Sequence, residues 1–401
     1  MRAIRPESLP LDVGPTPLAI LGASVRAAAV SAWRSGLRPI AADLFGDRDL
    51  QAIADWQRVP DYPRGFLAVA GRLPRSPWIY TGGLENHPEL IDALAARNPL
   101  LGNSGEVLRA VRDPWQVAAC LRRHGLHFPE SHRTRPQDGS GARWLRKPLD
   151  SSGGGRIREV GNEPGMPAAA RHYYQRVLSG PALSAVYVAG ERCARLWGVT
   201  RQWTGVSWTG ARPFAYCGSL GPLNLHPSLR EQLQQIGHGL AAEFALKGLF
   251  GVDTILVGRR IFVLEVNPRY TASVEVLEQG LEGSALRAHV EACRTQGLPD
   301  SPRRCDSRWY GKAILFAREG LRVPAEFTEF ADRWGCRGPW SPLADVPATG
   351  TEIGPGRPLV TLRATAGTAG AVRERLQQLA EQVRAVCARS QRPETFTPSL
   401  H

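Results

Sequence analysis

Lysine is nearly absent from this chain. Only three of its 50 basic residues are lysines, at positions 147, 247 and 312, and the 37 acidic residues leave a formal net charge of +13. A nucleic-acid-binding protein is expected to gather such charge into a stripe or a recognisable module, but here basic residues are spread from Arg2 to Arg392 with acids between them. Nucleic-acid binding is therefore a minority hypothesis. The positive field favours anionic small molecules, such as nucleotides and carboxylates.

Long apolar runs and paired cysteines are also missing. Nowhere do 18 apolar residues follow one another, and the N-terminal stretch MRAIRPESLPLDVGP holds no apolar segment of the signal-peptide type. The seven cysteines form no C-x-x-C pair and are dispersed, which is typical of reduced thiols rather than of a disulfide framework. The nine histidines show no H-E-x-x-H or comparable spacing. We therefore expect a cytoplasmic protein without a membrane partner.

The first third of the chain has the pattern of an α/β unit. LAIL (18–21) predicts a buried strand, residues 27–35 a helix, and PIAADLF (39–45) a second strand, while residues 78–103 continue the alternation. Asp43 follows Gly22 at about the distance typical of nucleotide-binding α/β units. The glycine fingerprint is missing, however, because residues 22–26 contain a single glycine. A Rossmann-like domain over residues 1–108 is predicted, without dinucleotide binding.

A second unit is predicted to begin near residue 109. Asp113-Pro114 is a strong helix start, and Ser228-x-x-Glu231 is a capping box that opens a long amphipathic helix. Other elements are expected in three stretches: strand, glycine-rich turn and strand over 141–160, a hairpin over 182–203, and strands over 312–317 and 358–366 followed by a helix. The predicted domains are therefore 1–108, 109–300 and 301–401, in an α/β (α+β) protein.

The run IFVLEVNPRY (261–270) begins like a buried strand and ends with an acid, an amide and a guanidinium. With period-two alternation, Ile261, Val263, Glu265, Asn267 and Arg269 share one face, and Phe262, Leu264 and Val266 share the other. If the preceding residues GRR (258–260) form the turn of a hairpin, Asp253 lies opposite Glu265. Two carboxylates and an amide oxygen in one place suit a hard cation such as Mg²⁺ or Mn²⁺. A strand end that simply reaches solvent is the competing interpretation.

A second anion-binding feature lies upstream. Lys147 ends a predicted strand and is followed by Asp150 and the loop SSGGG (151–155). Glycines let the backbone approach an anion closely, and a lysine supplies a point charge for phosphate. A flexible surface loop would explain SSGGG on its own, but the position of a rare lysine directly before it favours phosphate binding. It is not a Walker A motif, because G-x-x-x-x-G-K-[ST] is absent.

Together these motifs resemble the ATP-grasp superfamily. The resemblance rests on the order Lys147, glycine-rich loop, Asp253 and then EVNPR (265–269), and it covers residues 100–300. LEVNPRYTASVEVLE is especially similar to predicted ATP-dependent carboligases related to biotin carboxylase, and to enzymes like tyramine–glutamate ligase. The resemblance implies an ATP-grasp fold with a Rossmann-like N-terminal domain and a small C-terminal domain.

The resemblance also implies roles for individual residues. A hinge near 175–180 would separate two lobes, and ATP and Mg²⁺ (or Mn²⁺) would lie between them. Arg269 and Lys147 would be catalytic, with Asp253, Glu265 and Asn267 as metal ligands. ATP would be bound by Lys147, Ser151, Ser152, Gly153, Gly154, Gly155, Gln175, Arg176 and Val177. The chain departs from the family in two places: Pro114 stands where a lysine is common, and Gln175 where a glutamate is common.

Three functions remain open from the sequence. The first is an ATP-dependent ligase that joins a small-molecule carboxylate to an amine through an acyl phosphate, with a homodimer allowed. The others are a bicarbonate-using carboxylase and a nucleotide- or nucleic-acid-binding protein without turnover. The residues that would contact the substrate are expected among Gly22 to Arg26, Arg201 and YCGSLGP (216–222).

Overall fold

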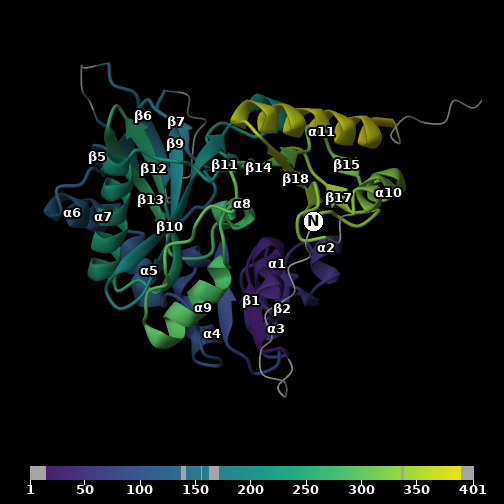
Figure 1. Ribbon diagram of the computed structural model, residues 1–401, viewed down its shortest axis with the longest axis horizontal. Coiled ribbons are helices and arrows are strands. Elements are labelled where there is room, and N and C mark those ends of the chain that lie inside the picture. The colour runs from purple at the N-terminus through teal and green to yellow at the C-terminus, as the bar shows by residue number, and fades with distance from the viewer. Residues whose placement is uncertain (1–14, 137–140, 155, 162–170, 336–337, 390–401) are drawn as a thin grey trace, which may run out of the picture.

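The computed structural model describes residues 15–136, 141–154, 156–161, 171–335 and 338–389. Within these residues the strands form four sheets, of which the largest has eight strands in the order β13-β12-β9-β10-β11-β14-β18-β16. This sheet runs through the middle of the molecule, with helices on its flanks (Figure 1). The α/β class expected from the sequence is confirmed.

The N-terminal unit is built on a parallel sheet with the order β3-β2-β1-β4. Its first strand, helix and second strand lie within a residue or two of the sequence prediction. The strands are β1 (Pro17–Leu21), β2 (Arg38–Asp43), β3 (Asp55–Arg58) and β4 (Trp78–Tyr80), and the helices are α1 (Arg26–Arg34), α2 (Arg48–Gln51), α3 (Gly65–Ala70), the single 3₁₀ turn η1 (Leu84–Asn86) and α4 (Pro88–Ala95). The chain that follows β4 emerges at the carboxyl edge of the sheet, where ligands of parallel α/β units bind.

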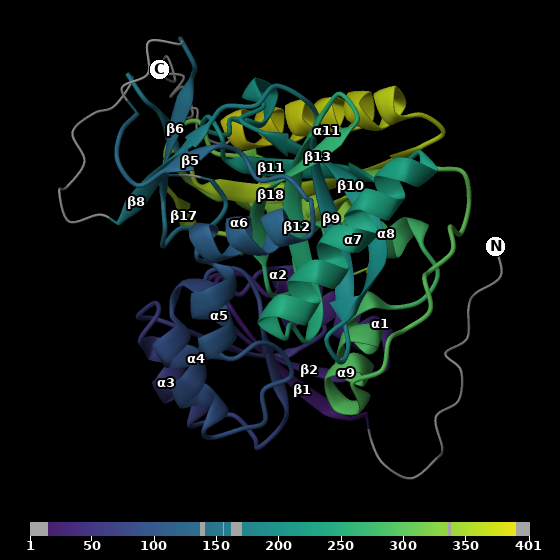
Figure 2. The ribbon, with the colours of Figure 1, turned by 90° about the vertical axis from the view of Figure 1, so that its left-hand side faces the viewer.

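A small antiparallel sheet follows two short helices. Asp113 accepts a hydrogen bond from the backbone N–H of Trp115 (2.8 Å) and starts α6, as predicted. The elements are α5 (Gly105–Val111), α6 (Pro114–Arg123), β5 (Ser131–His132), β6 (Trp144–Pro148), β7 (Arg158–Glu159) and β8 (His172–Arg176), with the sheet order β5-β8-β6-β7. In Figure 2 this sheet stands apart from the N-terminal unit, on the other side of α6.

The large sheet begins with the predicted hairpin. Its first strands are β9 (Ala182–Ala189), β10 (Ala194–Thr204), β11 (Tyr216–Gly221), β12 (Gly248–Val257) and β13 (Arg260–Asn267), accompanied by η2 (Ser207–Thr209), α7 (Pro227–Phe244), α8 (Ala272–Gly280) and α9 (Ala285–Thr295). The predicted capping box at Ser228 is wrong. His226 is the N-cap residue, and its Nδ1 accepts from the N–H of Ser228, so that Pro227 is the first helical residue.

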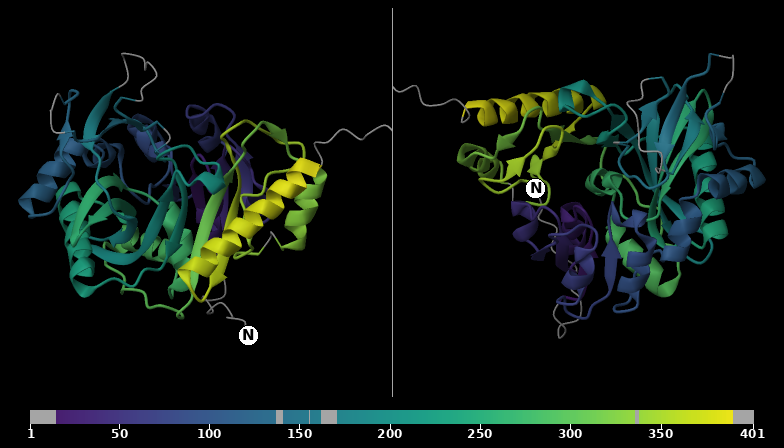
Figure 3. Two further views of the ribbon diagram at one scale, coloured as in Figure 1. Left: turned by 90° about the horizontal axis from the view of Figure 1, so that it is seen from above. Right: turned by 180° about the vertical axis from the view of Figure 1, so that it is seen from behind.

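The last part of the chain extends the same sheet. β14 (Trp309–Phe316) pairs with β11, and β18 (Pro358–Ala366) and β16 (Leu343–Ala344) follow outward. The remaining elements are β15 (Leu321–Arg322), α10 (Ala325–Arg333), β17 (Glu352–Ile353) and α11 (Ala369–Arg389). Figure 3 shows α11 lying along the outside of these strands. The division into domains after residues 108 and 300 remains a proposal, and the second boundary would cut through a continuous sheet.

The N-terminal unit and the large sheet share a hydrophobic core. Leu18 and Ile20 of β1 belong to one buried cluster with Val186 of β9 and with Leu277 and Leu286 of the covering helices. Burial of such side chains contributes roughly 25 cal/mol per Å² of apolar area. The two parts are therefore held in a fixed relation by apolar packing.

A buried ionic cluster joins the same parts to the C-terminal strands. Glu275 of α8 receives ion pairs from Arg26 of α1, from Lys312 of β14 (2.9 Å) and from Arg363 of β18 (3.0 Å). Arg26 is also paired with Asp345 (2.9 Å). Burial alone would raise the pKa of Glu275, but its three cationic partners hold that pKa well below the usual range.

None of the helices in the described part of the chain is both long and apolar enough to cross a membrane.

Candidate functional site

The hairpin β12–β13 brings Asp253 opposite Glu265, as the sequence predicts. It does so by a different route, because the turn is shorter by one residue than expected: Val257 pairs with Arg260 rather than with Ile261. A β-bulge between Thr254 and Asp253 then compensates, since Thr254 pairs with Val263 and Asp253 with Glu265, which leaves Leu264 as the extra residue. The shorter turn and the bulge shift the register by one residue in opposite directions, so that the predicted pairing of Asp253 with Glu265 is retained.

The bulge also changes which side chains share a face. The predicted alternation through the whole strand is wrong: Ile261, Val263 and Val266 all lie in one buried core cluster. Because the extra residue shifts the alternation by one, Glu265 is on the opposite side from Val263 instead of beside it. The apolar start of the strand therefore packs in the core, and the polar end is turned toward the site.

Asp253 lies at the centre of a polar group. Its Oδ1 accepts hydrogen bonds from Gln202 Nε2 (2.7 Å) and Ser184 Oγ (3.0 Å), and its Oδ2 accepts from Asn267 Nδ2 (3.1 Å). Burial and the neighbouring carboxylate of Glu265 raise the pKa of Asp253 to about 6. Two acids that repel one another in a buried place are the situation that a bound cation relieves.

Lys147 approaches the same place from β6. Its Nζ donates to Gln175 Oε1 (3.0 Å) and to the backbone carbonyl of Leu264 (3.3 Å), the residue that the bulge displaces. Burial would lower the pKa of Lys147, but Tyr173 and Glu265 outweigh it and raise that pKa. The ammonium therefore stays charged within a buried site.

Arg269 is held by an acid that the sequence did not single out. Its Nη2 donates to Glu85 Oε1 (2.6 Å) and to Asn267 Oδ1 (3.1 Å). The side chain of Glu85 is 0% exposed and that of Arg269 11% exposed. Although burial favours the neutral acid, Arg269 and Arg112 lower the pKa of Glu85 to about 2, so that it remains ionised.

The glycine-rich loop closes over this group. Gly153 and Gly154 have φ angles of +68° and +73°, the left-handed region that favours glycine. A Cβ atom at Gly154 would lie 2.1 Å from the carbonyl oxygen of Phe214, so that only glycine fits there. The N–H of Tyr216 donates to the carbonyl of Gly153 (3.0 Å), which ties the loop to β11. Gly155 lies outside the described residues.

Arg112 is a further cation at the site. Its guanidinium donates to the carbonyl of Ser151 (2.9 Å), to Asn86 Oδ1 (2.9 Å) and to Glu265 Oε1 (3.4 Å). Pro114 stands where the family commonly has a lysine after the aspartate, and Arg112, directly before Asp113, places a cation at the site instead.

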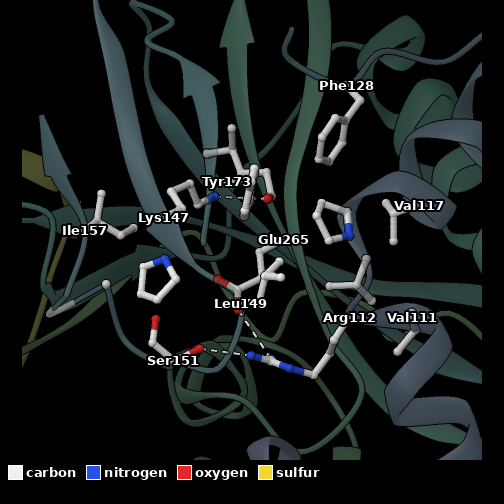
Figure 4. Close-up of a pocket in the computed structure, with 15 residues that line it drawn as sticks. Val111, Arg112, Val117, Phe128, Lys147, Leu149, Ser151, Ile157, Tyr173 and Glu265 are labelled. Carbon is white, nitrogen blue, oxygen red and sulfur yellow. Dashed lines mark hydrogen bonds and ion pairs between the residues drawn. The ribbon is translucent and has the colours of Figure 1, made fainter. Parts of the chain in front are cut away.

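A pocket opens between the small sheet and the hairpin, with about 550 Å³ of empty space that is partly open to solvent. In Figure 4, Lys147 and Ser151 lie to one side of Glu265, Val117 and Phe128 lie to the other side, and Arg112 lies below Glu265. Its wall comprises Val111, Arg112, Pro114, Val117, Phe128, Lys147, Pro148, Leu149, Ser151, Gly154, Ile157, Tyr173, Leu264, Glu265 and Val266. A charged end beside an apolar end matches a ligand with an anionic part and a flat, weakly polar part, as in a nucleotide.

The three residues predicted for the hinge differ in their burial and in their partners. Gln175 is buried and bound to Lys147, whereas the exposed Arg176 pairs with Glu130 (3.4 Å). The N–H of Val177 donates to the carbonyl of Arg143 (2.8 Å). Neither Arg176 nor Val177 is among the residues that form the pocket wall. Their contact with a nucleotide remains a prediction.

Of the residues expected to contact a substrate, Arg26 is 1% exposed and held in the ionic cluster described above. Arg201 is exposed on β10. In the 216–222 stretch, Tyr216 donates or accepts a hydrogen bond with Ser219 (2.8 Å) beneath α8. None of these placements identifies a substrate.

Comparisons with known proteins agree on the fold. Residues 111–273 match the family model described as ATP-grasp domain. Three solved structures resemble nearly the whole chain: N5-carboxyaminoimidazole synthetase from Staphylococcus aureus complexed with ADP (12% identity, TM-score 0.64, covering 92% of this chain and 97% of that one), a biotin carboxylase complex from Campylobacter jejuni (13%, 0.65, 89% and 89%) and L-amino acid ligase from Bacillus licheniformis (13%, 0.66, 92% and 98%). Among curated protein sequences, none matches the chain. At these identities the likeness is one of fold.

Proposed function

We propose that this protein is an ADP-forming ligase, from the premise that residues 111–273 match the ATP-grasp domain and that nearly the whole chain has an ATP-grasp fold. It activates a small-molecule carboxylate with ATP as an acyl phosphate and joins it to an amine, with release of ADP and phosphate. The match of nearly the whole chain to L-amino acid ligase, and to a synthetase complexed with ADP, supports this proposal.

One observation carries the proposal: the sequence motifs for phosphate and for cation binding converge on a single place. Lys147 contacts the backbone of Leu264, and Glu265, the next residue, faces Asp253. The loop from Ser151 to Gly154 contributes to the same pocket wall. Independent surface loops and strand ends would have no reason to meet in this way.

The residues present would act through charge and position. Lys147 is placed to neutralise a phosphate oxygen, and the loop would present its backbone N–H groups to the same anion. In the first step a substrate carboxylate oxygen attacks the terminal phosphorus of ATP and ADP leaves. In the second an amine attacks the acyl carbon, phosphate leaves, and the amine loses a proton. In this proposal Arg269 stabilises the charge that develops in both steps.

The donor set fits a divalent cation. Asp253 and Glu265 would supply carboxylate oxygens and Asn267 an amide oxygen, the ligands that Mg²⁺ and Mn²⁺ prefer. Asn267 Oδ1 accepts from Arg269 (3.1 Å) and Asn267 Nδ2 donates to Asp253 (3.1 Å), so these two hydrogen bonds would be exchanged for the cation. No group of three or more His, Cys, Asp or Glu side chains able to hold a metal occurs among the described residues. A cation here would therefore need phosphate oxygens to complete its coordination, and it would supply charge neutralisation on the transferred phosphoryl group.

The test is incubation with Mg-ATP and a pool of carboxylates and amines, followed by measurement of ADP and mass spectrometry of new products. The variants Glu265→Gln and Lys147→Ala serve as inactive controls. We expect ADP formation that requires both a carboxylate and an amine. A folded protein that binds ATP but forms no ADP with any such pair would contradict the proposal.

A second candidate is a carboxylase that uses bicarbonate. It is favoured by the match of the whole chain to N5-carboxyaminoimidazole synthetase and biotin carboxylase. Labelled bicarbonate distinguishes the two functions, because only the carboxylase incorporates the label into its product.

A further inference from the structure

Two neighbouring residues of the N-terminal unit contact the glycine-rich loop. Glu85 Oε1 accepts a hydrogen bond from Ser152 Oγ (2.9 Å), and Asn86 Nδ2 donates to the same hydroxyl oxygen (2.9 Å). The hydroxyl of Ser152 is thus used both as a donor and as an acceptor. We call these three residues, Glu85, Asn86 and Ser152, the loop clasp.

The clasp also reaches the residues that would act on the substrate. The oxygen of Glu85 that accepts from Ser152 accepts at the same time from Arg269 Nη2 (2.6 Å). Asn86 Oδ1 accepts from Arg112, which in turn donates to the carbonyl of Ser151 (2.9 Å each) and to Glu265. The same carboxylate oxygen of Glu85 therefore contacts both the loop, through Ser152, and Arg269.

Burial makes these contacts strong. The side chain of Glu85 is fully buried, and its second oxygen, Oε2, has no hydrogen-bond partner among the described residues. The hydrogen bonds that other described residues donate to the Glu85 side chain therefore both end on Oε1, and the charge is further stabilised by Arg112 nearby. Hydrogen bonds to a buried charged group are roughly twice as strong as neutral ones. Loss of the contact with Ser152 would remove one of the two donors to Oε1 and change the interaction of Glu85 with Arg269.

We propose that Glu85 and Asn86 are positioning residues. They hold the glycine-rich loop closed, and at the same time they fix the position of the Arg269 side chain. The N-terminal unit then contributes residues that position the site, in addition to packing against it. Loop closure over a nucleotide and correct placement of Arg269 become one event, so that Arg269 is aligned only when the loop is shut. The catalytic consequence rests on the proposed function, whereas the loop contact can be tested without turnover.

The test is hydrogen–deuterium exchange of the backbone amides of residues 151–157, read by mass spectrometry on the full chain. Ser152→Ala and Glu85→Gln should each raise the exchange rate roughly tenfold, because each weakens the same charge-assisted hydrogen bond. The double variant should exchange no faster than the faster single variant. Ser152→Thr retains the hydroxyl and should behave as the unchanged protein.

Glu278→Gln is the matched control. Glu278 is another buried acid, bound to Ser31 Oγ (2.6 Å) and to the N–H of Ala285 (2.8 Å), away from the loop. Its substitution should leave exchange of the loop unchanged. Exchange that stays constant in Ser152→Ala and Glu85→Gln, or that rises equally in Glu278→Gln, overturns the proposal. If Glu85→Gln does not fold, Ser152→Ala and Asn86→Ala, at half-buried positions, decide the matter.

Turnover provides the second readout. With ATP-dependent ADP formation as the assay, Ser152→Ala should mainly raise the KM for ATP, whereas Glu85→Gln should lower kcat roughly tenfold or more, because Arg269 is then misplaced. Equal effects of both variants on KM alone would refute the link to Arg269. Loop protection that depends on the clasp in a protein with no turnover would leave the clasp intact and count against the proposed ligase.

Discussion

Replacing Glu275 with glutamine should lower the free energy of unfolding by about 3–5 kcal/mol, the range for breaking a buried ion pair. The carboxylate is 2% exposed, and its partners Arg26, Lys312 and Arg363 are 1%, 5% and 4% exposed. None of these cations can turn to solvent without unpacking the protein. Arg26 keeps Asp345 as a partner, so that chiefly the charges of Lys312 and Arg363 lose compensation, and the lower half of the range is expected.

The assay is urea unfolding followed by circular dichroism at pH 7. Glu278→Gln is the control, because among the described residues that buried acid is ion-paired only with Arg34, at 3.5 Å and 26% exposed. It should cost about 1–2 kcal/mol, the value for hydrogen bonds to a buried charge. A loss below about 1 kcal/mol for Glu275→Gln would show that water or a rearranged Asp345 replaces the missing charge, and the reasoning from burial would fail.

Three further outcomes are expected. Burial lowers the pKa of His289 to about 4, below its unfolded value; stability should therefore be complete above about pH 6.5 and fall by about 3 kcal/mol toward pH 4. In His289→Gln this pH dependence of the free energy of unfolding should vanish, which unfolding curves measured at several pH values would show. Gly154→Ala should prevent the loop from closing against Phe214, raising the KM for ATP by at least tenfold with an unchanged melting temperature; a normal KM would contradict the steric argument. Lys147→Ala should weaken ATP binding roughly 10- to 100-fold by calorimetry, and an unchanged affinity would place the phosphates elsewhere.

The pairing of Asp253 with Glu265 was predictable because it depends on local register. Strand alternation and a short turn were enough to place Asp253 opposite Glu265. The bulge at Leu264 was not predictable, since nothing in an apolar run marks which residue will be left unpaired. The carbonyl of the displaced Leu264 accepts a hydrogen bond from Lys147, which is distant in sequence. The predicted register at Asp253 was therefore correct only because the shorter turn and the bulge offset one another.

Glu85, Asn86 and Arg112 were beyond reach of sequence patterns for another reason. Each lies in or just after a short element, where polar residues are common and carry no signal. Glu85 and Asn86 meet Ser152 through contacts between residues more than 60 positions apart, and Arg112 meets the neighbouring Ser151, so their closeness depends on how the N-terminal unit packs against the loop of the small sheet. Lys147 and the glycines were recognisable because their residue types are unusual at those positions, whereas an acid after a strand is ordinary.

The ionic cluster around Glu275 has a consequence for biosynthesis. Arg26 pairs with Asp49 within the N-terminal unit (3.4 Å), but its other two acidic partners, Glu275 and Asp345, follow it by 249 and 319 positions. The N-terminal unit, which folds first, therefore holds Arg26 with one of its three acidic partners until α8 and the residues around Asp345 have emerged. A chain truncated before Arg363 would leave that cluster incomplete and expose the surface where the parts join, a state that chaperones and proteases recognise. The ionic cluster around Glu275 is therefore complete only after β18, the last strand, has been synthesised. Until then the buried charges of the cluster are not fully compensated.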